Sequence, residues 1–290
     1  LATLNKSRLA CKMAVGKLTE CPFDDDLLGR LREDWFSLLG VSSVQDWRKV
    51  TENQPFFLFA IGETLRRMED PDWKIFAAEE KSFVSGVPVG PGHTFTRTAE
   101  VFPEKTKSRR YDETDLISEM DNYKSATAEI LEKQFEEEAE LGLMYKTSLS
   151  AARSEYRDKL RIAALGSILK GDNSWRVIHD GTHGVRVNHE VKFVDQVQFP
   201  TAEDMKRSMS LSKAAGALVG FGLKADVKKA HRRVLHARAD WGYLACRTSQ
   251  DSDCVWLNRC GTFGVASAGY WWQRLSSAIH RLALRLSLKS

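Results

Sequence analysis

Residues 221–238 read Phe-Gly-Leu-Lys-Ala-Asp-Val-Lys-Lys-Ala-His-Arg-Arg-Val-Leu-His-Ala-Arg, and the rest of the chain is organised around this stretch. Apolar residues lead into one carboxylate, Asp226, and a basic segment follows it. We predict a strand over 220–226, with Asp226 at its end. A single aspartate in such a place is usually a cap or a turn residue. A chemical role for Asp226 can therefore be inferred only together with the neighbouring blocks of sequence.

The chain has 290 residues, of which 42% are hydrophobic, so it is long enough to bury a core and to form one large or two modest domains. The net charge of +4 indicates nothing about nucleic acid, but its distribution is uneven. Residues 112–140 hold eleven acids against two lysines, whereas residues 205–290 hold fifteen basic residues against four acids. This asymmetry predicts an acidic face and a polyanion-binding surface, with Arg232 and Arg233 as test positions if they are exposed.

The cysteines and the hydropathy of the chain indicate in which cellular compartment the protein is expected. The five cysteines, at 11, 21, 246, 254 and 260, include no Cys-x-x-Cys pair, which favours reduced thiols in an intracellular protein, either cytoplasmic or nuclear. We find neither a signal peptide nor an apolar run of about eighteen residues, so no membrane partner is expected. The chain begins with Leu1 instead of Met, as a fragment would.

The first 158 residues are predicted to be mainly helical. Acids in the first turn and apolar spacing indicate a helix over 24–39, with others over 55–67 and 72–80. Glycine and proline make 82–110 an extended linker, whose basic end at 105–110 is either a solvated loop or a phosphate contact. A long helix with an acidic solvated face is predicted over 112–141.

A hairpin is predicted next. Residues 161–170 are compatible with a strand, Gly-Asp-Asn-Ser at 171–174 is a turn, and 175–180 alternates, which places Lys170 and Arg176 near the tip. A competing interpretation is a metal site, because four potential ligands are close in sequence. These are His179, Asp180, His183 and His189, which lack cysteine partners and surround an apparent turn.

The last part of the chain alternates again between helix and strand signals. Thr201-Ala-Glu-Asp204 is a capping box for a helix that ends near Ala214. Strands are predicted over 241–247 and 254–258, with Asp251 and Asp253 in the turn between them. A glycine-rich turn at 260–264 then opens an aromatic helix over 265–284.

Three of these blocks, in this order, resemble the fingers and palm of a retrotransposon reverse transcriptase, an RNA-directed DNA polymerase. They are Trp175 to Asn188, residues 221–238, and the run from Cys260 to Leu275 with its Phe-Gly and Ser-Ala steps. The resemblance covers 159–290, or 132 of 290 residues. It implies an α+β fold: a helical N-terminal region at 1–80, a linker and long acidic helix at 81–158, and at 159–290 partial right-hand polymerase fingers and palm with an antiparallel sheet.

The resemblance also implies roles for single residues. Lys170 and Arg176 match the fingers residues that grip the triphosphate of a dNTP, for which the planar fork of arginine is suited. His231 stands where relatives carry an aromatic residue that rejects the ribose 2′-hydroxyl. Phe263 and Gly264 match the turn under the nucleotide.

The implied cofactor is Mg²⁺ or Mn²⁺, held by the carboxylate of Asp226 and the backbone carbonyl of Val227. Polymerase chemistry uses two such ions, one to activate the attacking hydroxyl and both to stabilise the transferring phosphoryl group. Relatives supply further carboxylates from a Tyr-x-Asp-Asp hairpin, and no adjacent Asp pair occurs here after residue 26. The ions are therefore expected only with a complete active site.

The sequence predicts a fragment of an RNA-directed DNA polymerase, inactive alone, whose partners are an RNA or DNA template-primer and dNTPs. The alternative is a non-catalytic, nucleic-acid-binding remnant of a retroelement polymerase. A third possibility is a helical scaffold in which the resemblance is accidental. Template preference, oligomeric state and the role of residues 1–110 are not readable from the sequence.

Overall fold

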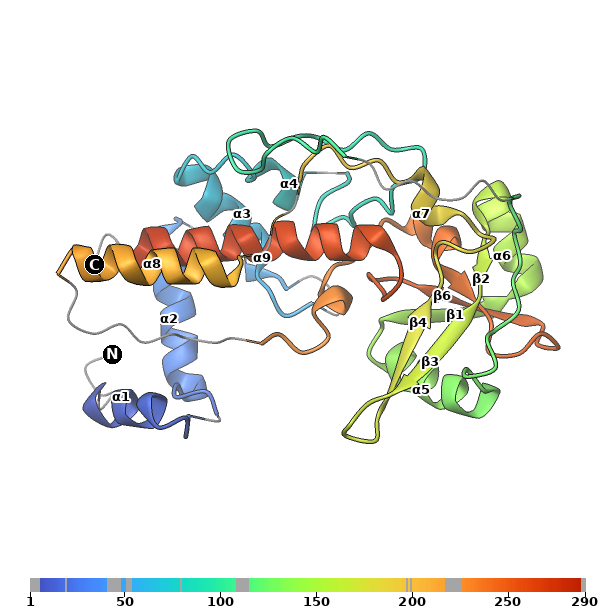
Figure 1. The fold of residues 1–290 in the computed structure, drawn as a ribbon, viewed down its shortest axis with the longest axis horizontal. Helices are drawn as coiled ribbons and strands as arrows, with labels where there is room; N and C mark the ends of the chain where they lie inside the picture. Colours follow the sequence, from blue (N-terminus) through green and yellow to red (C-terminus); the bar gives the residue numbers. More distant parts are fainter. Residues whose placement is uncertain are drawn as a thin grey trace. The chain divides into compact units, whose positions relative to one another are not determined.

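The computed structural model contains helices together with antiparallel and mixed β-sheets, which confirms the α+β class (Figure 1). The chain forms two compact units: the first joins Leu1–Gln45 to Gln198–Val227, and the second joins Asp46–Val197 to Lys228–Ser290. The structure describes residues 6–18, 20–40, 48–50, 54–78, 80–107, 115–196, 198, 200, 201–216 and 226–287.

The first unit contains three described helices, α1 (Lys6–Ala14), α2 (Asp25–Leu38) and α8 (Ala202–Ala214). The predicted helix over 24–39 is confirmed, and Asp24 caps it by accepting a hydrogen bond from the Leu27 amide at 2.7 Å. The predicted capping box at the start of α8 is also present, since the Asp204 carboxylate accepts from the Thr201 amide at 2.8 Å.

The second unit carries the remaining described helices: α3 (Leu58–Arg67), α4 (Lys74–Ala77), α5 (Ala128–Glu140), α6 (Leu149–Tyr156), α7 (Val187–Glu190) and α9 (Ala266–Ser287), and the 3-10 turns η2 (Arg157–Lys159), η3 (Ala230–Arg233) and η4 (Arg238–Leu244). α9 matches the predicted aromatic helix. Within the described residues, none of the helices is long and apolar enough to cross a membrane.

The predicted long helix over 112–141 is wrong, because of its described residues, 115–141, only Ala128–Glu140 are helical. Residues 118–123 are extended, and their backbone bonds to the strands instead: the Met120 amide donates to the Ile162 carbonyl at 2.8 Å, and the Tyr123 amide donates to the Leu165 carbonyl at 2.9 Å. The Asn122 side chain completes this pairing by accepting from the Leu165 amide at 3.0 Å. Since these amides are satisfied by another segment, the helix begins only after them.

Four strands form one sheet in the order β1-β6-β5-β2: Met144–Ser148, Cys254–Asn258, Ala245–Cys246 and Ile162–Ala163. The β5–β6 pair is antiparallel, as predicted for these two segments, whereas β1, which was not predicted, pairs antiparallel with β6, and β2 runs parallel to β5. The predicted strand over 241–247 is mostly wrong, because η4 occupies its first part. A Cβ on Gly242 would lie 2.7 Å from the Cβ of Tyr156, so the tight 3-10 turn is packed directly on α6.

The predicted hairpin is confirmed. β3 (Leu165–Leu169) pairs antiparallel with β4 (Trp175–His179), and Figure 1 shows the two strands projecting away from α9. The base of the hairpin belongs to a buried apolar cluster with the sheet and α5, in which Leu165, Phe135 and Trp256 take part. This packing fixes the hairpin at one end and leaves its tip exposed.

The basic C-terminal third is not a simple polyanion surface, because acids from upstream segments neutralise much of it. Arg232 is 6% exposed and pairs with the buried Glu138, so it is unsuitable as a surface test position. On α9, Arg274 pairs with the buried Asp72, and Arg281 contacts Asp70 at 2.8 Å. These charges hold the second unit together.

Candidate functional site

The second unit contains a cavity of about 870 Å³, which falls in the size range of small-molecule sites. Five chain segments line it, so it exists only in the folded chain. The lining residues are Tyr123, Ser125, Gly166, Ser167, Ile168, Ile178, Asp180, Thr182, Asn188, His231, Thr262, Phe263, Gly264, Val265, Ala266, Ala268 and Gly269.

One face of the hairpin turns toward this cavity. In its register Gly166 is opposite Ile178, and Ile168 is opposite Arg176, so these four residues share a face of the two strands. The guanidinium of Arg176 lies over the ring of Phe263, 4.9 Å from its centroid. The hairpin therefore brings an exposed cation to the edge of the cavity.

The turn at Phe263 and Gly264 is clamped to the base of the hairpin. The His179 amide donates to the Phe263 carbonyl at 2.9 Å. Gly264 has a φ of +95°, and a Cβ there would collide with the carbonyl oxygen of His179. Glycine is thus required at this position by both the backbone conformation and the close approach of the two chains.

Asn188 connects the same turn to α9 and to the loop after β4. Its Nδ2 donates to the Gly264 carbonyl and to Thr182 Oγ1, each at 2.8 Å, and its Oδ1 accepts from the Ala266 amide at 2.8 Å. The side chain is nearly buried, at 6% exposure. Asn188 therefore holds one wall of the cavity through hydrogen bonds on both sides of its amide.

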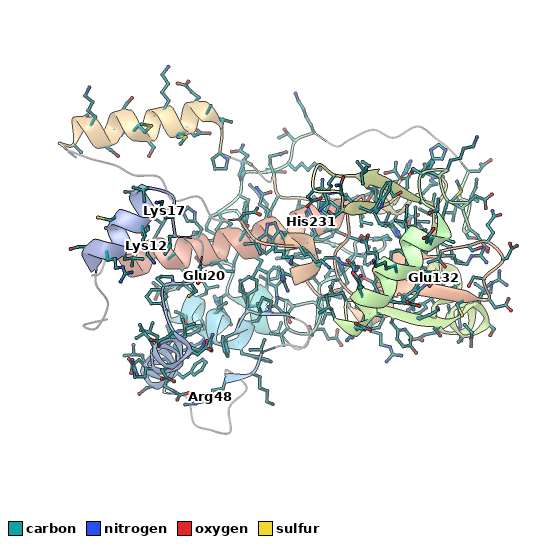
Figure 2. All side chains as sticks on the ribbon, turned by 90° about the horizontal axis from the view of Figure 1, so that it is seen from below. Lys12, Lys17, Glu20, Arg48, Glu132 and His231 are labelled. Atoms are coloured by element: carbon teal, nitrogen blue, oxygen red, sulfur yellow. The ribbon has the colours of Figure 1, made fainter. Side chains whose placement is uncertain are left out.

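His231 forms another wall and lies on η3 beside α9 (Figure 2). Its ring meets Phe263 edge to face, with centroids 4.9 Å apart. Its Nδ1 is buried and has no hydrogen-bond partner within the described part of the protein. The neighbouring Arg232 anchors η3, since its Nη1 donates to Asn258 Oδ1 at 2.7 Å and its Nη2 pairs with Glu138.

Two polar residues of the cavity, Tyr123 and Asp180, were not predicted to act together: Tyr123 was not a candidate site residue, and Asp180 was one only in the competing metal site. The Tyr123 hydroxyl donates to Asp180 Oδ2 at 2.6 Å, and Asp180 Oδ1 accepts from the amides of Thr182 at 2.9 Å and His183 at 3.0 Å. Burial raises the pKa of Asp180, but these hydrogen bonds outweigh burial and leave it below the ordinary value. The bond to Asp180 raises the pKa of Tyr123 to about 12, so the hydroxyl keeps its proton.

The predicted site residues lie in three places: at the cavity, at the exposed end of the hairpin, and in the first unit. His231, Phe263 and Gly264 line the cavity, and Arg176 lies at its edge over the ring of Phe263. Lys170 lies at the exposed end of the hairpin, where it contacts Asp172 at 3.5 Å, and it is not part of the cavity wall.

Asp226 and Val227 belong to the first unit, and both are exposed. The predicted strand over 220–226 falls almost wholly outside the described residues, which resume at Asp226 in a segment without regular structure.

In the described ranges, no three His, Cys, Asp or Glu side chains gather into a group that could hold a metal ion. The alternative metal site around the hairpin is therefore not formed; His179 in particular is buried, which lowers its pKa to about 4. The one predicted carboxylate, Asp226, does not fit a two-ion site by itself, because hard cations in such sites need several oxygen ligands.

Comparison with known proteins adds no assignment: neither a scan of protein-family models nor a search of curated proteins finds a match for this chain.

Proposed function

We propose that this chain supplies the fingers and part of the palm of an RNA-directed DNA polymerase, and that the cavity receives the incoming dNTP. The contact between Arg176 and Phe263 carries the proposal. It joins two sequence blocks, 87 positions apart, that resemble the triphosphate grip and the nucleotide-binding turn of this class of enzyme.

The cation of Arg176 is available to a ligand. Its guanidinium makes no ion pair with any residue in the described ranges, in contrast to the paired arginines of α9. A guanidinium presents its donors in a planar fork that matches two oxygens of a phosphate. Stacking on Phe263 orients this fork without using its N–H groups, so both contacts can form together.

The rest of the cavity suits the nucleoside part. Phe263 is 39% exposed and Tyr123 is 47% exposed, so two flat rings from different segments face the solvent at a site of this size. Aromatic faces of this kind stack on nucleobases regardless of their identity. His231, packed on Phe263, gives a polar wall at the position where relatives carry an aromatic residue.

Catalysis by two metal ions needs more carboxylates than the described residues bring together in one group. The chain alone is expected to bind dNTPs and a template-primer and to give no primer extension with Mg²⁺ or Mn²⁺. Extension by the chain alone would show that its metal ligands differ from those proposed.

The test is the affinity of the 290-residue chain for dATP and dAMP, measured by titration calorimetry for the parent, Arg176→Ala and Arg153→Ala. Arg153 is the matched control, since it is exposed on α6 and contacts Glu119 at 3.4 Å, and it is not part of the cavity wall. Charge-assisted hydrogen bonds contribute about 1.5–3 kcal/mol, so Arg176→Ala should weaken dATP binding by roughly tenfold or more and dAMP binding much less. Equal losses for both nucleotides, or for both variants, would refute the proposed phosphate contact.

A further inference from the structure

Two extended segments that are far apart in the sequence pair with each other in the second unit. An antiparallel bridge joins Glu104 to Asp195, and backbone hydrogen bonds of 2.8 and 2.9 Å hold the segments together on either side of it. We call residues 103–107 and 192–196 the basic ribbon. It connects the basic end of the predicted linker to the segment just after α7.

The inner side of the basic ribbon is fixed to α9. Asp195 is 1% exposed, contacts Arg274 at 3.4 Å and accepts a hydrogen bond from the Tyr270 hydroxyl at 3.4 Å. The ring of Phe193 stacks on the ring of Tyr270, with centroids 4.5 Å apart. Since Tyr270 follows Gly269, which lines the cavity, the same end of α9 supports both the ribbon and the cavity wall.

The outer side of the basic ribbon carries three cations. Lys107 and Lys192 are exposed and Lys105 is partly exposed, and none of them makes an ion pair with the described residues. The Lys105 ammonium lies 5.2 Å from the centroid of the Phe193 ring, which helps to hold it in place. Lys107 and Lys192 come from different segments and lie toward the same end of the ribbon, where an anion between them would relieve the repulsion of like charges.

The acids around the ribbon leave this positive charge in excess. Residues 97–107 and 190–196 contain four acids, of which Asp195 is turned inward. Two others are paired with arginines at 3.4 and 2.7 Å, in the pairs Glu104–Arg97 and Glu190–Arg161. Glu100 is left exposed, so three lysines face a single acid that no arginine of the described residues neutralises.

We propose that the basic ribbon binds the phosphate backbone of a nucleic-acid strand. Lysines from two neighbouring segments can contact several phosphates at once, and the backbone that carries them is already held in place. The ring of Phe193 is occupied by Tyr270, so this contact is independent of base sequence. The choice of nucleic acid among polyanions rests on the proposed function, in which a template passes the dNTP site.

The experiment measures the affinity of the 290-residue chain for a labelled oligothymidylate of about 16 nucleotides, by fluorescence anisotropy between about 50 and 200 mM salt. Each phosphate of a single strand that is neutralised contributes about −0.7 to the slope of log K against log salt concentration. The triple variant Lys105→Gln/Lys107→Gln/Lys192→Gln should therefore make the slope shallower by about 2 and weaken binding tenfold or more at the lowest salt. The same three positions changed to arginine should bind as the parent does.

The control variant changes the net charge equally at exposed lysines outside the ribbon: Lys12→Gln/Lys81→Gln/Lys133→Gln. It should keep the slope of the parent. The same loss in both triple variants would show that only net charge matters, and would overturn the inference.

Glu104→Gln provides a test that damage to the fold cannot imitate. The substitution removes an acid from the ribbon and releases Arg97, so it should tighten oligonucleotide binding several-fold and steepen the slope by about 0.7. Glu136→Gln, at an exposed acid of α5, is the matched control and should change neither quantity. An unchanged or weakened affinity for Glu104→Gln would refute the inference.

Further outcomes separate this inference from the proposed function. Polyglutamate that competes as well as the oligonucleotide would overturn nucleic acid as the partner of the ribbon. If dATP binding depends on Arg176 while oligonucleotide binding ignores the ribbon variants, the polymerase proposal stands and the inference is wrong. If the oligonucleotide depends on the ribbon while dATP ignores Arg176→Ala, the ribbon stands as a nucleic-acid surface and the dNTP contact is wrong.

Discussion

Replacing Asn188 by alanine tests whether the cavity depends on one buried amide. The substitution removes three hydrogen bonds of 2.8 Å, to Gly264, Thr182 and Ala266. Each contributes about 1 kcal/mol net, and a buried group left without a partner costs about 1–3 kcal/mol more. We therefore expect Asn188→Ala to lower the free energy of unfolding of the second unit by about 3–5 kcal/mol.

Urea unfolding followed by tryptophan fluorescence measures this change, because seven of the eight tryptophans fall in the second unit and only Trp35 in the first. Asn188→Asp is the matched control: its carboxylate still accepts from the Ala266 amide at the start of α9, where a negative charge is favourable, but it cannot donate to the Gly264 carbonyl. The free energy of unfolding should be lowest for Asn188→Ala, intermediate for Asn188→Asp and highest for the parent. A change below about 0.5 kcal/mol for Asn188→Ala would refute the reasoning.

Two further predictions concern buried charge. Burial lowers the pKa of His179 and of His236 to about 4, so between pH 6.5 and 4 the unfolded chain binds protons that the folded chain does not. Stability should therefore fall as the pH drops through this window, by about 3 kcal/mol per histidine at most, and His179→Leu should flatten the dependence of the urea midpoint on pH between 7 and 5. Arg274→Met should cost about 3–5 kcal/mol in the same assay because the buried Asp195 loses the cation it contacts and Asp72 keeps only Arg281, whereas Arg153→Met should change little; a similar loss for both would contradict the buried network.

The parts of the fold that were predictable are those specified by nearby residues. The helix α2 follows from its cap at Asp24 and its apolar spacing, and α8 follows from the capping box at Thr201. The β3–β4 hairpin follows from a Gly-Asp-Asn-Ser turn between a segment compatible with a strand and an alternating segment at 175–180. In each case the hydrogen bonds that define the element are made within a few residues of the pattern.

The parts that were missed depend on distant partners. Segment 118–123 has apolar residues at helical spacing, yet its amides and carbonyls pair with β2 and β3, about 40 residues later. Tyr123 falls within the long helix predicted over 112–141, but in the structure it lines the cavity. The sequence indicated Asp180 only as a possible metal ligand, because nothing in it placed the hydroxyl of Tyr123 beside this carboxylate.

The basic segment after Asp226 shows how a charge count can conceal a structural role. Arg232 is buried, and a buried guanidinium without a counter-charge would be strongly destabilising, so Glu138 on α5 must lie beside it. That pair, with the bond to Asn258, fixes η3 and thereby the ring of His231 against Phe263. The acidic helix and the basic segment are thus two halves of one internal contact. Their opposite charges, far apart in the sequence, place one wall of the cavity. At the edge of that cavity, Arg176 makes no ion pair with the described residues, and its contact with the ring of Phe263 leaves its N–H groups available to a ligand.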